Sequence, residues 1–294
     1  MKQSFDLTTS PLLKKRRVFD QTFRALCMLT SILGCVVLAV LLYNILDMGL
    51  GRLNWDFLKS FPSRFPERAG IKAAMFGTAW LMVFTLIFTV PIGVGAAIFI
   101  EEFMRPSRIK KIIEINIANL AGVPSIIYGM LGLALFVRLI QLERSVLAGA
   151  LTLSTLILPI VIITTREALR AVPSNLREAS LALGATPIQT VFRVVLPAAT
   201  PGMMTGILLA LSRAIGETAP LIMIGVPTFI AFTPSGPMDT FTALPMQIFN
   251  WAQRPQEEFQ ANAGAGIIVL LFLLLLMNSV AIFIRQKYSS RARN

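Results

Sequence analysis

The chain has 294 residues, of which 55% are hydrophobic and only 14% charged, and its mean hydropathy is +0.72. This balance excludes an ordinary soluble domain and indicates an all-α protein that crosses a membrane several times. The formal net charge of +12 is explained better by membrane orientation than by nucleic acid, because the basic residues lie between apolar stretches.

Six apolar stretches are long enough to cross a membrane, since a span needs roughly 20 mainly apolar residues. They are about 25–46, 73–100, 112–137, 146–165, 202–230 and 263–284. The sequence therefore predicts a single membrane domain with a short tail at each end, divided as 1–24, 25–285 and 286–294.

Basic residues mark one side of this predicted domain. They cluster in the N-terminal tail, at 105–111, at 166–193 and in the C-terminal tail, and six crossings bring all four clusters to the same side. The positive-inside rule places both termini in the cytoplasm of a bacterial cell. Segment 47–71 fits less well, because it carries four basic residues on the predicted outer side.

The first span contains both cysteines, Cys27 and Cys35. Eight residues of helix rise roughly 12 Å, too far for a disulfide bond, so packing is the expected role. The string SILGC at 31–35 resembles a lipoprotein cleavage site. The apolar run continues to Leu46, however, as expected for an uncleaved span.

Several classes of chemistry are excluded by composition. Histidine is absent, which removes His-dependent zinc sites and His-based triads, and no GxxxxGK[ST] motif is present to hold a nucleotide. No nucleophile–base pair is recognisable. We therefore expect no catalytic residue, no metal site and no cofactor in this chain, and any energy for transport must enter through another polypeptide.

The third predicted span contains AGVPS, in which Gly122 and Pro124 favour a distorted helix with freed backbone groups. Arg138 lies towards the outer end of that span. Two roles stay open for it: attracting an arriving anion, or extending its guanidinium to the outer headgroups.

The connection at 166–200 is the longest on the predicted cytoplasmic side. Asn175 is expected to cap a helix whose third position is Glu178 and which stops at Gly184, where positive φ is easily adopted. Arg177, beside Glu178, suits either a solvated or interface position or the exit of an anion path.

A second helix is expected after Gly184. Thr186 caps it, with Pro187 at the first position and Gln189 at the third, and Pro197 ends it. Its apolar face comprises Ile188, Val191, Phe192 and Val195. The helix pair suits either a docking surface for another protein or two helices lying on the headgroups.

The stretch SRAIGETAPL places Arg213 and Glu217 inside the fifth predicted span. Arg213 lies roughly 17 Å into a span that begins near Gly202, and Glu217 follows one turn later. A charge at this depth costs about 2.5–3.5 kcal/mol, and the Arg-before-Glu order is the weaker one for a helical ion pair. A guanidinium matches a tetrahedral oxyanion, so an anion path explains the pair better than an intrahelical bridge.

Neighbouring residues favour a distorted, polar helix at this point. Pro220 lacks an N–H and frees the carbonyl of Gly216, and Thr218 adds a hydroxyl. Segment 231–262 then carries five apolar or aromatic residues, which suit the membrane interface or contact with a delivery protein: Phe241, Leu244, Ile248, Phe249 and Trp251.

Segment 166–200 also carries a family resemblance. The order Glu178-Ala179-Ser180, three residues, Gly184, nine residues and Val194-Val195-Leu196-Pro197 resembles the EAA loop of bacterial ABC-importer permeases. Ser180 replaces the second alanine and Val194 the isoleucine. The resemblance implies that this segment inserts into a separate ATP-binding subunit, although Glu178 as a cap and Gly184 as a helix stop are also compatible.

Four further stretches resemble the membrane subunits of the phosphate importer, of the PstA type. They are GTAWLMVFTLIFTVPIGVGAAIFIEEF, AGVPSIIYGMLGL, SRAIGETAPLIMIG and TALPMQIFNWA. The resemblance implies a type I importer fold, an alternating-access mechanism, a homologous second permease of the PstC type, two ATP-binding subunits that use ATP and Mg²⁺, and a phosphate-binding protein outside. Import of sulfate or molybdate by the same fold is the nearest alternative, ahead of a secondary transporter or an intramembrane enzyme.

Overall fold

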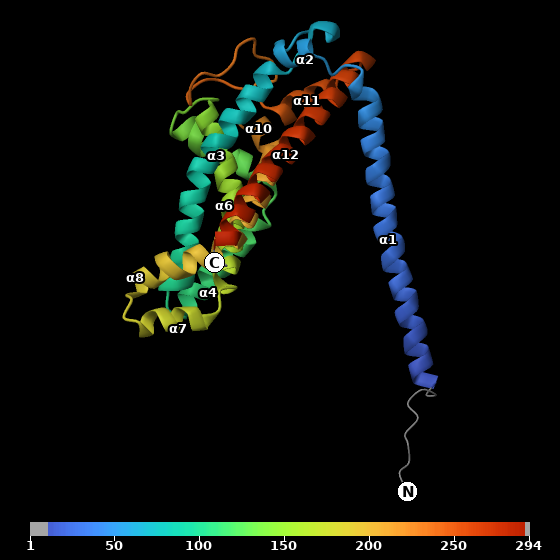
Figure 1. Cartoon of the computed structure of the whole chain (residues 1–294). Helices are drawn as coiled ribbons and strands as arrows, with labels where there is room; N and C mark the ends of the chain where they lie inside the picture. Colours follow the sequence, from blue (N-terminus) through green and yellow to red (C-terminus); the bar gives the residue numbers. More distant parts are fainter. Residues whose placement is uncertain (1–10, 292–294) are drawn as a thin grey trace.

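The computed structural model describes residues 11–291, which form helices, loops and one isolated bridge between Ser145 and Thr240 (Figure 1). The helices are α1 Pro11–Leu50, α2 Trp55–Lys59, η2 Pro66–Arg68, α3 Lys72–Ile98, η3 Phe99–Phe103, α4 Arg108–Ala121, α5 Ser125–Gly132, η4 Leu133–Leu139, α6 Val146–Arg170, α7 Ser174–Ala182, α8 Pro187–Thr190, η5 Val191–Val195, α9 Leu196–Ile215, α10 Ala219–Met223, α11 Leu244–Ala252 and α12 Glu257–Arg291.

The predicted number of membrane spans is confirmed when one bent pair counts as a single span. Within residues 11–291, five stretches are long and apolar enough to cross a membrane: Lys15–Leu50, Lys72–Phe103, Val146–Arg170, Pro187–Ile215 and Glu257–Val280. The remaining span is divided between Arg108–Ala121 and Ser125–Leu139, which meet at 98°. The break lies at Gly122–Pro124, where the sequence predicts distortion.

The fifth span is displaced from its predicted position. It occupies Pro187–Ile215 instead of 202–230, and Pro197 lies within it instead of ending a separate helix. The physical reason is the π-helical turn η5, which ends two residues before Pro197. A π turn changes the hydrogen-bond register, so the proline ring and its missing N–H fall where α9 begins and do not interrupt an established α-helical ladder.

Helix α6 forms the centre of the bundle. It lies against α3 on one side and α9 on the other, and 67% of its most apolar stretch is buried. Small residues permit these close crossings. A Cβ on Gly93 of α3 would lie 2.7 Å from the Val161 side chain, and a Cβ on Gly206 of α9 would overlap the Thr164 side chain. Packing of this kind replaces the hydrophobic driving force, which is absent between helices in lipid.

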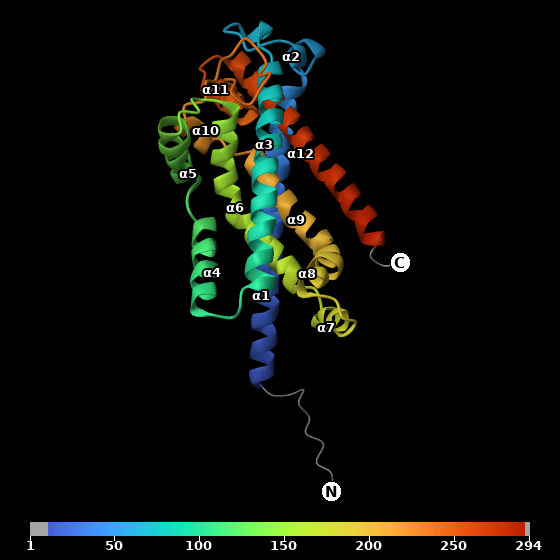
Figure 2. The same ribbon diagram turned by 90° about the vertical axis from the view of Figure 1, so that its left-hand side faces the viewer.

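The two ends of the bundle differ in character. Figures 1 and 2 show α7 and α8 at one end and α2 and α11 at the other. At the α2–α11 end, the interface location predicted for segment 231–262 is wrong for most of the apolar side chains. Phe241, Leu244 and Trp251 are fully buried and Ile248 is 9% exposed, whereas Phe249 is 41% exposed. The three residues of α11 pack against α2, α3 and α12, and Phe241 packs against α3, α6 and α10, in a core that a linear pattern does not reveal.

Helix α1 extends away from the rest of the bundle (Figure 1). It contacts α12 near its C-terminal end, where a Cβ on Gly49 would lie 2.5 Å from the carbonyl carbon of Gly264. The packing expected of Cys27 and Cys35 is not formed within the described chain, since both are exposed. The helix begins at Pro11, inside the predicted tail, while residues 1–10 and 292–294 of the two tails lie outside the described residues.

Candidate functional site

Arg213 and Glu217 lie where the fifth span ends. Arg213 is in the last turn of α9, and its Nε is 3.3 Å from Oε1 of Glu217. The arginine side chain is 46% exposed and the glutamate side chain 16%. Because α9 stops at Ile215, Glu217 belongs to the loop and not to the same helix. The pair thus joins a helix end to the segment that follows it, with the guanidinium partly free for another ligand.

The predicted distortion around Pro220 is a complete break. Gly216 ends α9, Thr218 precedes α10 without a side-chain capping bond, and Pro220 is the second residue of α10. At that position a helix does not use the N–H that proline lacks. The break therefore arises before Pro220, and the expectation that this proline removes a bond from a continuous helix is wrong.

The break in the third span lies beside the break in the fifth. Helix α4 ends at Ala121 with Gly122 as its C-cap, and Pro124 precedes α5, which packs on α10. A Cβ on Gly129 of α5 would lie 2.7 Å from Cα of Pro220 and 2.8 Å from Cβ of Met223. Glycine is required for this close approach. The two short helices that follow the breaks therefore form one packed unit.

Two polar groups that the sequence reasoning missed border this region. The Tyr128 hydroxyl donates across the first break to the carbonyl oxygen of Leu120 at 2.8 Å, and its ring packs with Leu211 and Ala214 of α9. Ser212 Oγ bonds Oδ1 of Asn278 in α12 at 2.8 Å. The sequence carried a signal for each of these two groups: Tyr128 follows the AGVPS break by one turn, and Asn278 interrupts an apolar run.

Arg138 is not brought next to Arg213. It is exposed in the last turn of η4, ten residues beyond Tyr128 on the same bent span, which corresponds to roughly 15 Å of helix. The sequence-predicted substrate residues therefore form one group at the breaks, with Arg213, Glu217 and Thr218 together and Arg138 apart.

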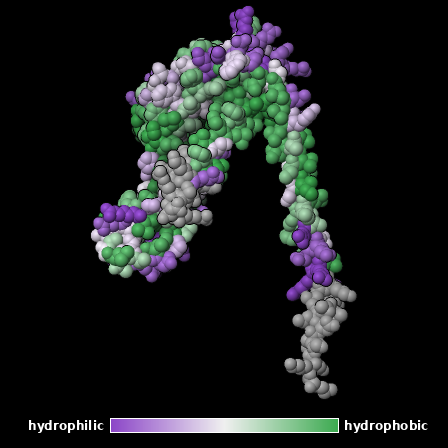
Figure 3. All heavy atoms as spheres, viewed as in Figure 1, coloured by the Kyte–Doolittle hydropathy of each residue, from purple (hydrophilic) through white to green (hydrophobic). Residues whose placement is uncertain are grey.

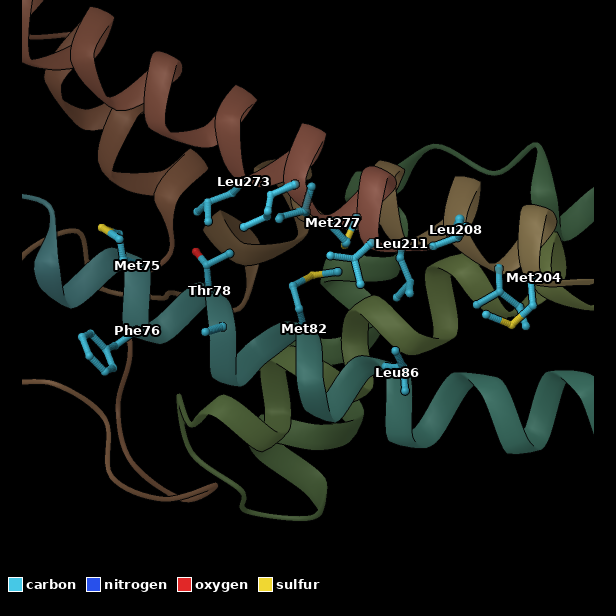
Figure 4. Close-up of a pocket in the computed structure, with 15 residues that line it drawn as sticks. Met75, Phe76, Thr78, Met82, Leu86, Met204, Leu208, Leu211, Leu273 and Met277 are labelled. Atoms are coloured by element: carbon cyan, nitrogen blue, oxygen red, sulfur yellow. The ribbon is translucent and has the colours of Figure 1, made fainter. Parts of the chain in front are cut away.

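A cavity of about 640 Å³ lies between α3, α9 and α12 (Figure 4). Its lining is made of methionine, leucine and other apolar side chains together with Thr78, whose hydroxyl oxygen accepts a bond from the Leu244 N–H at 2.8 Å. An oxyanion needs donors and positive charge, so this cavity does not suit one. Within residues 11–291, no group of three or more acidic, cysteine or histidine side chains is arranged to hold a metal ion.

The structure has the predicted helix, break and second helix in segment 166–200, but the first helix is capped differently and, as described above, Pro197 does not end the second. Helix α7 begins at Ser174 after Pro173, so Asn175 is not its cap. Gly184 has φ of +83°, as its predicted role as a helix stop requires. Thr186 and Gln189 form the predicted capping box, with bonds of 3.3 Å and 2.9 Å.

Replacing Gly184 with valine should destabilise this turn by about 1–2 kcal/mol, because L residues adopt positive φ poorly. A Cβ there would meet nothing within 4 Å, so the penalty comes from the backbone alone. Asparagine, which tolerates this conformation better, is the matched variant. We expect limited proteolysis of the full chain to cleave Gly184→Val at the α7–α8 turn faster than Gly184→Asn, and equal cleavage rates would contradict the backbone argument.

The apolar face predicted for the second helix is divided between core and surface. Val191 and Val195 are buried, whereas Ile188 is 61% and Phe192 54% exposed. The buried pair packs with Leu169 at the end of α6. Ser180 and Thr190 join α7 to α8 by a hydroxyl–hydroxyl bond of 2.9 Å. One side of the segment is thus attached to the spans, and the other presents apolar side chains outward.

The EAA-like residues differ in their surroundings. Glu178 and Ala179 are exposed on α7, and Pro197 is exposed near the start of α9. Arg177 is turned inward instead: it donates to the carbonyl oxygens of Leu169 and Val172 at 2.8 Å and 2.7 Å and pairs with Glu102. The Arg177 side chain is 24% exposed, so it is only partly solvated, and its role at the exit of an anion path stays a prediction.

Comparison with known proteins agrees with this geometry. The sequence profile of the family described as "Binding-protein-dependent transport system inner membrane component" matches residues 89–294. The probable ABC transporter permease protein YqgI of Bacillus subtilis is 30% identical over 88% of this chain and 93% of its own length. The phosphate transport system permease protein PstA of Haemophilus influenzae is 32% identical over 92% of this chain and 96% of its own length.

Solved structures share the fold. A bacterial ABC transporter involved in the import of the acidic polysaccharide alginate aligns with a TM-score of 0.63 over 92% of this chain and 99% of its own, at 18% identity. The inward-facing MetNI methionine ABC transporter aligns with a TM-score of 0.57 over 74% of this chain and 95% of its own, at 20% identity.

Proposed function

Because the chain belongs to the family of binding-protein-dependent transport system inner membrane components, we propose that it is the permease subunit of an inorganic phosphate importer. It is a multi-pass inner-membrane permease of an ABC importer, and ATP hydrolysis in such importers belongs to a separate subunit. Phosphate as the substrate is supported by relatives at about 30% identity that are phosphate transport permeases.

The observation that carries the proposal is the partly exposed guanidinium of Arg213 at the end of the fifth span, next to the break in the third span. Its planar fork of donors matches the oxygens of a tetrahedral oxyanion. In our proposal Glu217 pairs with Arg213 between transport events, so that the arginine is never left without a counter-charge. When phosphate binds, the same carboxylate accepts a hydrogen bond from a protonated phosphate oxygen, which sulfate at neutral pH lacks.

The partners follow from the two ends of the bundle. We place the α7–α8 end in the cytoplasm, where exposed apolar side chains form a surface for one of two ATP-binding subunits: Leu176, Leu181, Leu183, Ile188 and Phe192. The α2–α11 end then faces a phosphate-binding protein outside, with Arg138 attracting the released anion. The green flank of α1 in Figure 3 contacts lipid and a second, PstC-type permease.

Alternating access uses the breaks already described. The packed α5–α10 unit is joined to α4 and α9 through Gly122–Pro124 and Gly216–Thr218. Closure of the ATP-binding subunits on α7 and α8 drives a rotation about these short connections. The rotation exposes Arg213 to each side of the membrane in turn.

Uptake of labelled phosphate by cells expressing the chain with its partner subunits tests the substrate. We expect ATP-dependent uptake that an excess of sulfate does not reduce, because sulfate cannot donate a hydrogen bond to Glu217. Inhibition by sulfate or molybdate would instead assign the path to another oxyanion. Uptake that persists after the ATP-binding subunits are removed would indicate a secondary transporter.

A further inference from the structure

Six charged side chains form a cluster at the α7–α8 end of the bundle, outside the proposed anion path. Arg166 pairs with Glu114 and bonds Glu101 at 3.3 Å, and Arg170 bonds Glu101 at 2.7 Å. Arg177 completes the cluster through Glu102 at 2.7 Å. Charges from η3, α4, α6 and α7 are therefore joined at one place.

The π-helical turn η3 divides the cluster into two parts. Glu101 and Glu102 are consecutive, so their side chains leave the helix in different directions. Glu101 faces the two arginines of α6, whereas Glu102 faces Arg177 of α7. The end of the second span is thus attached separately to the fourth span, through Glu101, and to α7, through Glu102.

Arg177 makes most of the close polar contacts of α7 with the spans. Its Nε and Nη2 bind the two oxygens of Glu102 at 3.2 Å and 2.7 Å, while Nη1 and Nη2 bind the carbonyl oxygens of Val172 and Leu169. The Glu102 side chain is 9% exposed. In α7, which is described in full, no residue is buried, so apolar packing does little to fix the position of this helix.

We propose that the Arg177–Glu102 pair is the link that transmits displacement of α7 to the end of α3. A bidentate guanidinium–carboxylate contact fixes orientation as well as distance, which a single-point contact does not. Helix α7 then moves the second span with it, and the carbonyl bonds from Arg177 bring the end of α6 into the same motion. This inference rests on the proposed function, because it requires that a partner ATPase displaces α7.

The variants Arg177→Gln and Glu102→Gln test the link, each alone and combined, in the purified complex with its partner subunits in liposomes. We expect ATP-binding subunits to co-purify in wild-type amounts and ATP hydrolysis to continue, while phosphate imported per ATP hydrolysed falls at least tenfold. The double variant should be no worse than either single one, since both remove the same contact. Arg170→Gln, which removes an ion pair from the same cluster without touching α7, is the matched control and should keep the wild-type ratio.

An unchanged ratio of import to hydrolysis in the single variants would overturn the proposal, and so would losses that add in the double variant. A proportional fall in hydrolysis and import would also overturn it, because the pair would then serve assembly or stability instead of transmission.

A distance measurement separates failure of this proposal from failure of the proposed function. Spin labels at Leu181→Cys on α7 and Phe99→Cys on η3, both exposed positions, require Cys27→Ser and Cys35→Ser as background. With ATP bound or absent, the label separation should stay constant in the otherwise wild-type complex and change in Arg177→Gln. If phosphate is not the substrate, this readout still decides the link, and a separation insensitive to Arg177→Gln refutes it.

Discussion

Arg213→Ala is expected to reduce phosphate uptake roughly tenfold to a hundredfold at equal membrane levels of the protein. The variant removes the guanidinium that we assign to the anion, and hydrogen bonds to charged groups are worth about 1.5–3 kcal/mol each, which corresponds to that range. Uptake by Arg213→Lys should lie between that of the wild type and that of Arg213→Ala, because lysine keeps the charge and lacks the planar fork of donors. Labelled phosphate uptake at several concentrations, with immunoblots of the membrane fraction, measures the effect.

The comparison variant is Arg138→Ala. Arg138 is an exposed arginine on η4, away from both breaks, so its removal should lower uptake less than removal of Arg213 and mainly at low phosphate concentration. Normal uptake by Arg213→Ala would assign Arg213 to a structural role. The proposed attachment of α7 to the ATP-binding subunits would not be affected by that outcome.

Gly129→Val is expected to abolish most transport and to lower the free energy of unfolding by about 1–3 kcal/mol, the usual penalty of overpacking. The added side chain meets backbone atoms of Pro220, which cannot move aside as a flexible side chain does. Separation of α5 from α10 would then disturb both breaks and the position of Arg213. Phosphate uptake and thermal unfolding in detergent report the two effects.

Gly95→Val is a matched control for that substitution. Gly95 is also inside a helix, and a Cβ there meets nothing within 4 Å. Both variants change helix propensity in the same way, so only the close approach to α10 differs between them. If Gly95→Val and Gly129→Val behave alike, the α5–α10 contact is not important for transport.

Much of the structure of segment 166–200 follows from local rules. Thr186 and Gln189 form a capping box, with Pro187 between them at the first position of the helix. Gly184 supplies the positive φ between the two helices. These features depend on residues within one turn of each other, which is why the sequence predicts them. The Asn175 cap fails because the cap position is occupied by Pro173, so that the helix begins at Ser174 and Asn175 is its second residue.

The sequence by itself determined the membrane class, the number of spans, the break near Gly122 and the presence of a distortion near Gly216, since hydropathy and helix-breaking residues act locally. Only the tertiary structure decided that the two breaks adjoin, that Phe241 and Trp251 are buried, and that Glu102 pairs with Arg177. These contacts join residues far apart in the chain. Apolar periodicity reports which face of a helix is buried, and it does not report which distant segment covers that face.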